Sequence, residues 1–288
     1  MPNRNFLRRL VLCSIGLGAL LAAVAASASQ APEIDAGFRL LYELKFTEAR
    51  AQFSAWQKAH PDDPLGSASE AASYLFEEFY HQGVLTSEFF LDDRRLLGGI
   101  SGKPDEARRA GFTAANQRTQ ELARQRLRAN PQDADALFAL TISTGMQADY
   151  ASLIEKRQFE SLRLFRRAED YAKQLLAIAP DSADAYLALA AANYILGCLP
   201  LHKRIFLWFG GIRGDKARGM EQLQMAAARG RYLRPFAKTL LALAALREKQ
   251  PELARQQLRE LVAEFPQNPL FARELAKLEK PATTVSRP

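Results

Sequence analysis

The sequence has few of the residues that build disulfide, redox or metal sites. It holds 2 cysteines and 3 histidines in 288 residues, and aromatic residues make up only 9%. His60, His81 and His202 have no second histidine or cysteine at a metal-binding spacing, so we expect no metal site. A single long apolar run excludes a protein with several membrane spans. Charged residues make up 25%, an ordinary fraction for a folded domain.

Recognisable catalytic motifs are missing as well. The glycine-rich stretch 98–103 ends in Gly-Lys, but Pro104 follows where a phosphate-binding loop needs Ser or Thr. Adjacent acids such as Glu77 and Glu78 point about 100° apart on a helix and cannot flank one substrate bond. We therefore expect a non-catalytic protein without a cofactor, and an envelope-associated enzyme is the least supported alternative.

Residues 1–28 are typical of a secretory signal peptide. Three arginines open the segment, residues 10–25 are apolar, and residues 26–28 read Ala-Ser-Ala. Such a small-x-small site predicts cleavage after Ala28 and export to the periplasm or beyond. The alternative is an uncleaved N-terminal membrane anchor, although the apolar run is shorter than the ~20 residues that span a bilayer.

The exported chain would carry a mild charge and a single thiol. Its net charge is three units below the +7 of the whole sequence, because the three arginines of the signal are lost. The remaining charge is spread along the chain, which argues against nucleic acid as a partner. Cys198 is the one cysteine left, so no internal disulfide is expected.

The rest of the chain has helical periodicity, interrupted by one recurring turn sequence. It occurs at 61–64, 131–134, 180–183 and 266–269, where Asp, Ser or Asn stands within two residues after a proline. Proline ends one helix, and the short polar side chain after it can cap the next. We therefore predict an all-α solenoid over 29–281, with a disordered tail at 282–288.

The turns divide this domain into five helical hairpins and one capping helix. The fourth hairpin lacks its proline and is expected to turn at Gly230. The predicted hairpins are 33–61, 64–130, 133–180, 182–229 and 232–266, followed by a capping helix at 269–280. Hairpins two and four are longer than the rest, which predicts inserts between their helices at roughly 83–104 and 199–214.

Small residues recur at one height on the second helices. Ala49, Ala168 and Ala254 each lie twelve residues before a turn proline, and in the first unit Gly37 lies twelve residues earlier still. With Phe53 at a large apolar position, this pattern resembles the tetratricopeptide repeat. The resemblance implies stacked helical hairpins whose first helices line a concave face.

The C-terminal half carries a more specific pattern. Its residues are Gly214-Asp215-Lys216-Ala217, Leu223, Ala226-Ala227, Leu240-Leu241 and Phe265-Pro266-Gln267-Asn268-Pro269-Leu270-Phe271. A similar run occurs in the eukaryotic tetratricopeptide-repeat-39 (inclusion-body clearance) family and in exported bacterial repeat proteins. The resemblance covers about a third of the chain and implies an adaptor role, although the signal peptide departs from the eukaryotic members.

The two inserts resemble each other and supply most of the candidate binding residues. Segment 97–102 matches 209–214, and each match precedes an Asp that can start a helix. The insert candidates are Phe89, Phe90, Arg94 and Arg95 in the first, and Arg204, Phe206, Trp208 and Phe209 in the second. Aromatic and arginine side chains are the usual anchors of interfaces, and loops on a rigid scaffold commonly carry recognition.

Aromatic residues on the first helices form a second set of candidates. They are Tyr186 and Tyr194 in hairpin four, and Tyr74, Phe76, Phe79 and Tyr80 in hairpin two. Such rings either face a ligand or fill the core between helices, and for a single ring the core is the commoner place. We expect a scaffold for a protein or peptide partner; the alternative is a membrane-surface adaptor anchored through 201–212.

Overall fold

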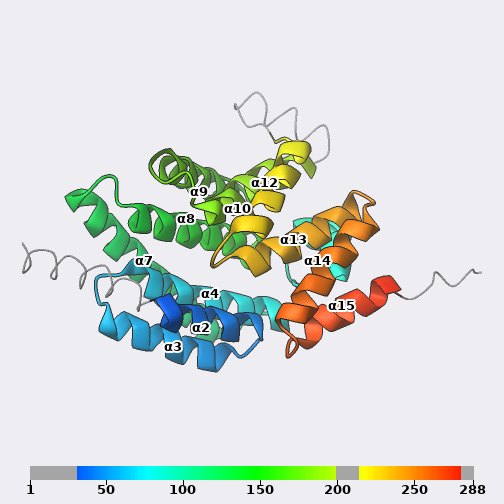
Figure 1. The fold of residues 1–288 in the computed structure, drawn as a ribbon, viewed down its shortest axis with the longest axis horizontal. Helices are drawn as coiled ribbons and strands as arrows, with labels where there is room; N and C mark the ends of the chain where they lie inside the picture. Colours follow the sequence, from blue (N-terminus) through cyan, green and yellow to red (C-terminus); the bar gives the residue numbers. More distant parts are fainter. Residues whose placement is uncertain (1–30, 199–213, 280–288) are drawn as a thin grey trace, which may run out of the picture.

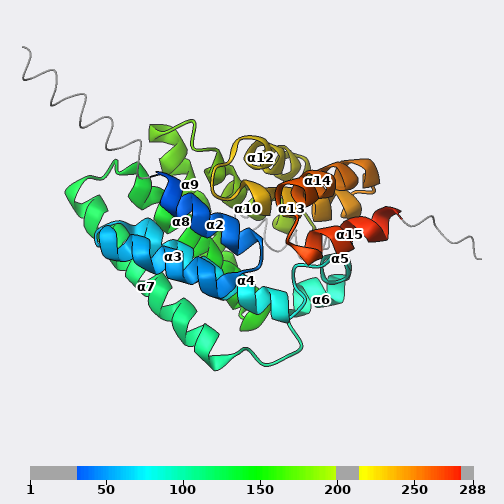
Figure 2. The same cartoon turned by 60° about the horizontal axis from the view of Figure 1, so that its bottom comes forward.

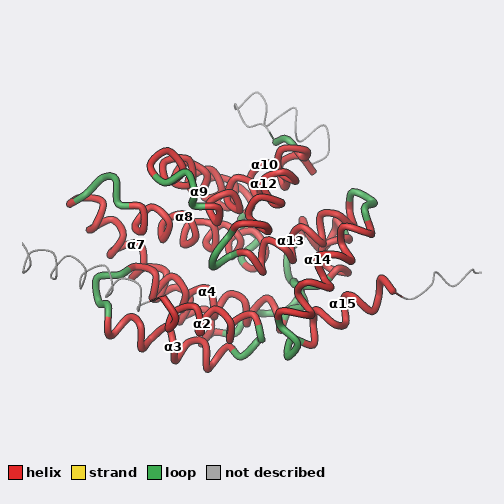
Figure 3. The backbone as a smooth tube through the Cα atoms, viewed as in Figure 1, coloured by secondary structure: helices red, strands yellow, loops and turns green. Residues whose placement is uncertain are grey.

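A computed structural model describes residues 31–198 and 214–279, in which helices are joined by turns and loops. They contain thirteen α-helices, one π-helix and one 3-10 helix, with no strand in these two stretches (Figures 1 and 3). The elements are α2 (Ala31–Tyr42), α3 (Phe46–Ala59), α4 (Pro64–His81), α5 (Ser87–Leu91), α6 (Asp93–Gly98), α7 (Glu106–Ala129), α8 (Ala134–Asp149), the π-helix η1 (Tyr150–Ile154), α9 (Gln158–Ile178), the 3-10 helix η2 (Ala183–Ala185), α10 (Tyr186–Cys198), α12 (Lys216–Arg229), α13 (Arg234–Arg247), α14 (Pro251–Glu264) and α15 (Pro269–Glu279).

The helices pair in sequence as five hairpins. These are α2–α3, α4–α7, α8–α9, α10–α12 and α13–α14, each packed on the next, and α15 packs on α14. The all-α solenoid predicted from the turn prolines is confirmed, and helix ends agree with the predicted hairpins to within a few residues. The first insert contains α5 and α6, between α4 and α7. The second, at 199–214, lies almost wholly outside the described residues, as do the predicted signal peptide and tail.

Capping explains why the helices begin where the sequence indicates. Asp63, Asp133 and Asn268 each accept a hydrogen bond at 2.8–2.9 Å from a backbone N–H in the first turn of the following helix. Asp105 and Asp215 cap α7 and α12 in the same way, as the insert comparison predicted. Each cap satisfies an N–H group that would otherwise have no helical partner.

The start of hairpin four is the exception, and its acid serves another helix. Ser182 makes no side-chain cap, and a 3-10 turn precedes α10. Instead, Asp184 accepts hydrogen bonds from the backbone N–H groups of Tyr232 and Leu233, both at 3.0 Å, just before α13. A Cβ at Gly230 would lie 2.5 Å from this carboxylate, so the glycine predicted at this turn leaves room for a bond between hairpins four and five.

The recurring small residues lie where paired helices touch. Ala49, Ala168 and Ala254 are at most 1% exposed. A Cβ at Gly37 would overlap the ring of Phe53, which is itself fully buried. These positions confirm that the small residues allow close approach within hairpins.

The solenoid bends so far that its last hairpin meets its first. The hydroxyl of Tyr42 on α2 donates to the carbonyl of Tyr232 at 2.9 Å, and Asn268 Nδ2 donates to the Tyr42 carbonyl at 2.7 Å. Phe76 on α4 packs edge-on against Phe236 on α13, with ring centroids 4.8 Å apart. Figures 1 and 2 show the consequence, with α2 and α4 beside α13 to α15. The two ends of the solenoid are therefore in contact, which the local turn and packing patterns of the sequence do not predict.

The first insert reinforces this closure. The N–H of Ser87 at the start of α5 donates to Glu274 on α15 at 3.2 Å, and Arg247 on α13 donates to the carbonyl of Phe90 at 2.7 Å. Farther along, the N–H of Ile100 donates to the carbonyl of Leu153 in η1 at 2.7 Å. Residues 83–104, which we call the strap, thus connect η1 after α8, the end of α13 and the middle of α15 (Figure 2).

Replacing either of two helical glycines by alanine should change stability, with opposite signs at the two positions. Gly37→Ala should lower the free energy of unfolding by about 1–3 kcal/mol, because the buried Phe53 ring must move. Gly145→Ala on α8 should raise it by up to about 1 kcal/mol, because a Cβ there meets no atom within 4 Å and alanine favours helix. Urea unfolding measures both, and equal effects at the two positions would contradict the packing described.

Asn268 allows the closure to be tested apart from the helix cap. Asn268→Ala should lower the free energy of unfolding by about 2–4 kcal/mol. The substitution removes the cap of α15 and leaves the buried Tyr42 carbonyl without its hydrogen-bond donor. Asn268→Ser keeps a capping oxygen and should recover about 1 kcal/mol of that loss. If serine restored full stability in chemical denaturation, the bond to Tyr42 would contribute nothing.

Candidate functional site

Aromatic rings fill one end of the interior enclosed by the first helices. The ring of Tyr232, just before α13, lies with its centroid 4.9 Å from Phe38 on α2 and 6.0 Å from Phe138 on α8. Phe76 and Phe236 meet beside them. These five rings come from four hairpins; Phe38 is buried, and the other four are partly buried where they pack on one another.

The aromatic residues predicted on α4 also pack within the protein. Phe79 is 3% exposed, and the Tyr80 ring lies 6.0 Å from that of Phe46. The Tyr74 ring lies under the guanidinium of Arg50, 4.7 Å from its carbon. Of the two uses that the sequence allowed for these rings, the structure shows the filling of helix contacts.

One strip of the interior is left open, and it lies along α8. Phe138, Ile142, Gly145 and Asp149 follow one another at helical spacing on a single face, and each is partly exposed. Phe138 shows that this face points inward, because its ring packs on Tyr232. At Gly145 an added Cβ would meet nothing within 4 Å. We call these four residues the α8 strip.

Asp149, at the end of the strip, is its one ionisable group. Burial raises the pKa of its carboxyl from the ordinary 3.8 to about 7, with no charge contributing to the shift. Within the described stretches it has no hydrogen bond or ion pair, yet part of its surface still reaches solvent. Ionising a largely buried carboxyl without a partner carries a desolvation cost. A cationic group bound beside the carboxylate could offset that cost.

The backbone changes form directly after Asp149. Residues Tyr150–Ile154 form the π-helix η1, and a π turn inside a helical run is often found at functional sites. Leu153 of this turn accepts the N–H of Ile100. Gly99 approaches so closely, at a φ of 72°, that a side chain there would strike the Leu153 carbonyl. The strap is therefore fixed beside the carboxyl end of the α8 strip.

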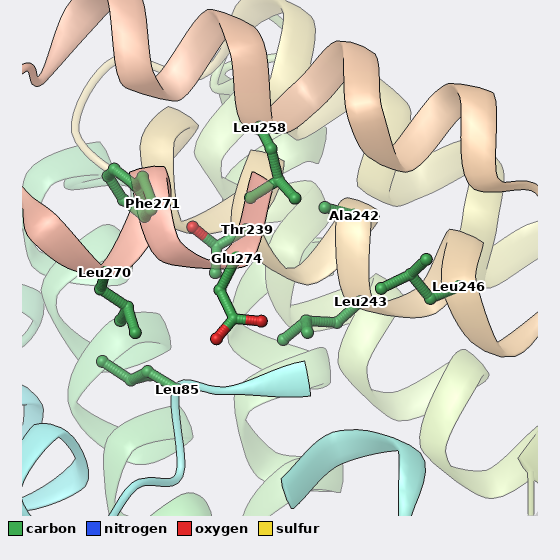
Figure 4. Close-up of a pocket in the computed structure, with 9 residues that line it drawn as sticks. All are labelled: Leu85, Thr239, Ala242, Leu243, Leu246, Leu258, Leu270, Phe271 and Glu274. Carbon is green, nitrogen blue, oxygen red and sulfur yellow. The ribbon is translucent and has the colours of Figure 1, made fainter. Parts of the chain in front are cut away.

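A small cavity lies between α13, α14 and α15 (Figure 4), and it is not a ligand site. Its volume is about 10 Å³, which is space for about one water molecule. Leu85 of the strap closes one side, and Glu274 contributes a carboxylate. That carboxylate accepts from the Ser87 N–H and pairs with Lys277 at 2.6 Å. Its charge is satisfied, so the cavity is a packing gap.

Charged pairs elsewhere hold helices together. Glu77 binds Arg50 of α3 at 2.6 Å, whereas Glu78 binds Arg108 of α7 at 2.7 Å. The two adjacent carboxylates therefore face different helices, as their spacing predicted. In the two described stretches, no three His, Cys, Asp or Glu side chains lie close enough to hold a metal ion.

The predicted partner-binding residues are dispersed. Phe89 and Tyr194 are core residues, 4% and 5% exposed, and the Tyr194 hydroxyl donates to Glu248 at 3.1 Å. Neither ring offers a partner a surface here, because apolar packing of the strap and of α10 encloses them. Tyr186 is partly buried between two core clusters.

Three of the strap candidates differ from Phe89 in exposure. Phe90 is partly exposed, and its carbonyl is held by Arg247. Arg94 and Arg95 are exposed on α6, so both remain predicted contacts. Four further candidates lie outside the described residues: Arg204, Phe206, Trp208 and Phe209. The predicted membrane segment 201–212 lies outside them as well.

The α8 strip was missed in the sequence because it resembles an ordinary core helix face. The one signal in the sequence is the spacing of Asp149, which lies eleven residues after Phe138 and so on the same helix face as Phe138 and Gly145. Periodicity alone cannot distinguish a face that packs from one that borders open space. Asp149 also follows a run of buried residues, where an unpaired carboxyl is unusual.

Comparison with known proteins does not assign the chain to a family. No protein-family model matches it, and no curated protein is similar enough to count as a relative. Among the helices that the structure describes, none combines the length and apolar character needed to cross a bilayer.

Asp149 predicts a specific dependence of stability on pH. Its pKa is higher in the folded than in the unfolded chain, so the folded state binds the proton more tightly. The stabilisation is present below pH 4 and is lost as the pH rises to about 7. Asp149→Asn removes this loss. The free energy of unfolding of the variant, measured relative to that of the wild type, should therefore rise by about 1–3 kcal/mol between pH 4.5 and pH 8. Urea unfolding of both proteins at the two pH values measures this change, and a stability difference that stays constant with pH would contradict the prediction.

Proposed function

We propose that the protein is an exported, non-catalytic scaffold of tetratricopeptide-like repeats that binds a peptide segment of a partner along the α8 strip. The observation that carries the proposal is the open, partly buried face of α8, which ends in an unpaired carboxyl. Export is proposed from the signal-like residues 1–28, and the repeat type from the spacing of Gly37, Ala49 and their equivalents.

The closed curve supports binding by a preformed site. Bonds from Tyr42 to Asn268 and Tyr232 fix the first hairpin against the last. A ligand therefore does not have to order the helices that surround it, which reduces the entropy lost on binding. The rings around Tyr232 limit the strip at one end, and the strap limits it at the other.

The chemistry of the strip specifies a ligand with one cationic group. Phe138 and Ile142 offer apolar contact, and Asp149 offers a carboxylate about three helical turns from Phe138. A lysine or arginine side chain would relieve the desolvation of that carboxylate. Arg94 and Arg95 on the strap would contact parts of the partner that extend beyond the interior.

An immobilised peptide library tests this function with residues 29–288. Peptides that are retained should share a lysine or arginine next to an apolar residue, and their capture should rise as the pH passes through 7, because Asp149 becomes charged. Asp149→Asn should weaken capture at least tenfold, since charged hydrogen bonds contribute about 1.5–3 kcal/mol. Gly145→Leu should also abolish capture by filling the open space.

Two surface substitutions on α9 serve as matched controls. Asp170→Asn and Ala177→Leu make the same kinds of change at exposed positions and should leave capture unchanged. Capture that survives Gly145→Leu would exclude the α8 strip as the site. The absence of any retained peptide would overturn the proposed function.

A further inference from the structure

A single aromatic ring projects from the start of α9. Phe159 is 87% exposed, far more than the two other large apolar side chains that stand out in the described residues, Leu91 at 46% and Ile178 at 36%. It lies in the first turn of α9, five residues after η1 ends. Leu162, one turn farther along the same face, is partly exposed.

The segment that carries the ring is rich in basic residues. Residues 155–167 contain five basic side chains and two acidic ones. Both acids are already paired inside the segment, Glu155 with Arg157 at 3.2 Å and Glu160 with Arg163 at 2.5 Å.

Three cations remain around Phe159. They are Lys156, Arg166 and Arg167, and none of them has an ion pair in the part of the chain that the structure describes. Lys156 stands in the turn before α9, at a φ of 59°. Arg166 lies two turns after Phe159 on the same face, and its long stem can lie along the helix while its head reaches a charged surface.

This combination fits a lipid surface better than a protein. A specific protein interface needs about 1,000 Å² or more of complementary surface, whereas Phe159 is a single projecting ring that is 87% exposed. A membrane interface needs no complementary shape: an aromatic ring enters the boundary of the headgroups while lysine and arginine attract anionic lipids.

We propose that the first turns of α9 form a membrane-docking tip, in which Phe159 enters the interface of an anionic bilayer and Lys156, Arg166 and Arg167 bind its headgroups. The tip is separate from the α8 strip and does not depend on the proposed peptide binding. The residues that form it are all described by the structure, whereas 201–212 are not.

Vesicle co-sedimentation of residues 29–288 tests the tip. Binding should be strong to phosphatidylcholine mixed with phosphatidylglycerol, weak to phosphatidylcholine alone, and reduced by high salt. Phe159→Ser should weaken binding about tenfold, from the loss of its buried apolar area. The combined Lys156→Gln, Arg166→Gln and Arg167→Gln variant should weaken it about 100-fold, at roughly fivefold per charge. Ile178→Ser and Lys173→Gln, near the other end of α9, should change nothing.

A second measurement follows the ring itself. Phe159→Trp should bind vesicles as the wild type does, and its emission should shift to shorter wavelength on anionic vesicles, relative to the parent chain with its 2 tryptophans. The proposed tip would be overturned if Phe159→Ser bound vesicles as the wild type does, or if the emission of Phe159→Trp did not shift on anionic vesicles. It would also be overturned if Trp208→Ser lost vesicle binding while Phe159→Ser kept it. Vesicle binding by Asp149→Asn and peptide capture by Phe159→Ser should persist, which separates the two proposals.

Discussion

The structure depends on the contact that Tyr42 makes at both its backbone and its side chain. Its carbonyl accepts from Asn268 and its hydroxyl donates to the carbonyl of Tyr232, so one residue of the first hairpin is bonded to both ends of the last. Helical repeats normally contact only their neighbours, and their ends are free to spread. Here contacts of high sequence separation hold the ends together, and the strap adds bonds of the same kind through Ser87 and Arg247.

Closure determines what the interior can do. Bringing α13 onto α2 and α4 buries Phe38 and packs the partly buried rings of Phe76 and Tyr232 at one end of the concave side. The other end keeps space at Gly145 and a carboxyl at Asp149 that no charge stabilises. An unpaired acid in such a place lowers the stability of the empty protein above neutral pH. An amide at this position would avoid that loss, and the proposed peptide binding would explain the presence of an acid.

The sequence predicted the parts of the fold that depend on local chemistry. Prolines and polar caps such as Asp133 located the turns, and small residues such as Ala49 located the close contacts within hairpins. Closure was not predictable in this way, because it depends on the angle accumulated over five hairpins. The bonds of Asn268 show the difference: its bond to the N–H of Leu270 follows from the turn motif, whereas its bond to Tyr42 joins residues 226 apart.

The accessibility of a candidate binding residue depends on tertiary contacts in the same way. Phe89 is aromatic and lies in an insert, which predicts a binding role, but docking of the strap makes it a core residue. The raised pKa of Asp149 has no local signal in the sequence, because it comes from burial in the folded chain. Residue type predicts which side chains can bind, and the tertiary contacts decide which of them remain accessible.

The two proposed surfaces lie near one end of α8 and differ in charge and depth. The strip is recessed and has one acid, and the tip is exposed and has an excess of cations. The two proposals therefore assign ligands of opposite charge to the two surfaces, a cationic peptide to the strip and an anionic bilayer to the tip. A protein held to a membrane by α9 would keep the α8 strip free for its partner, so the two activities can coexist in one small solenoid.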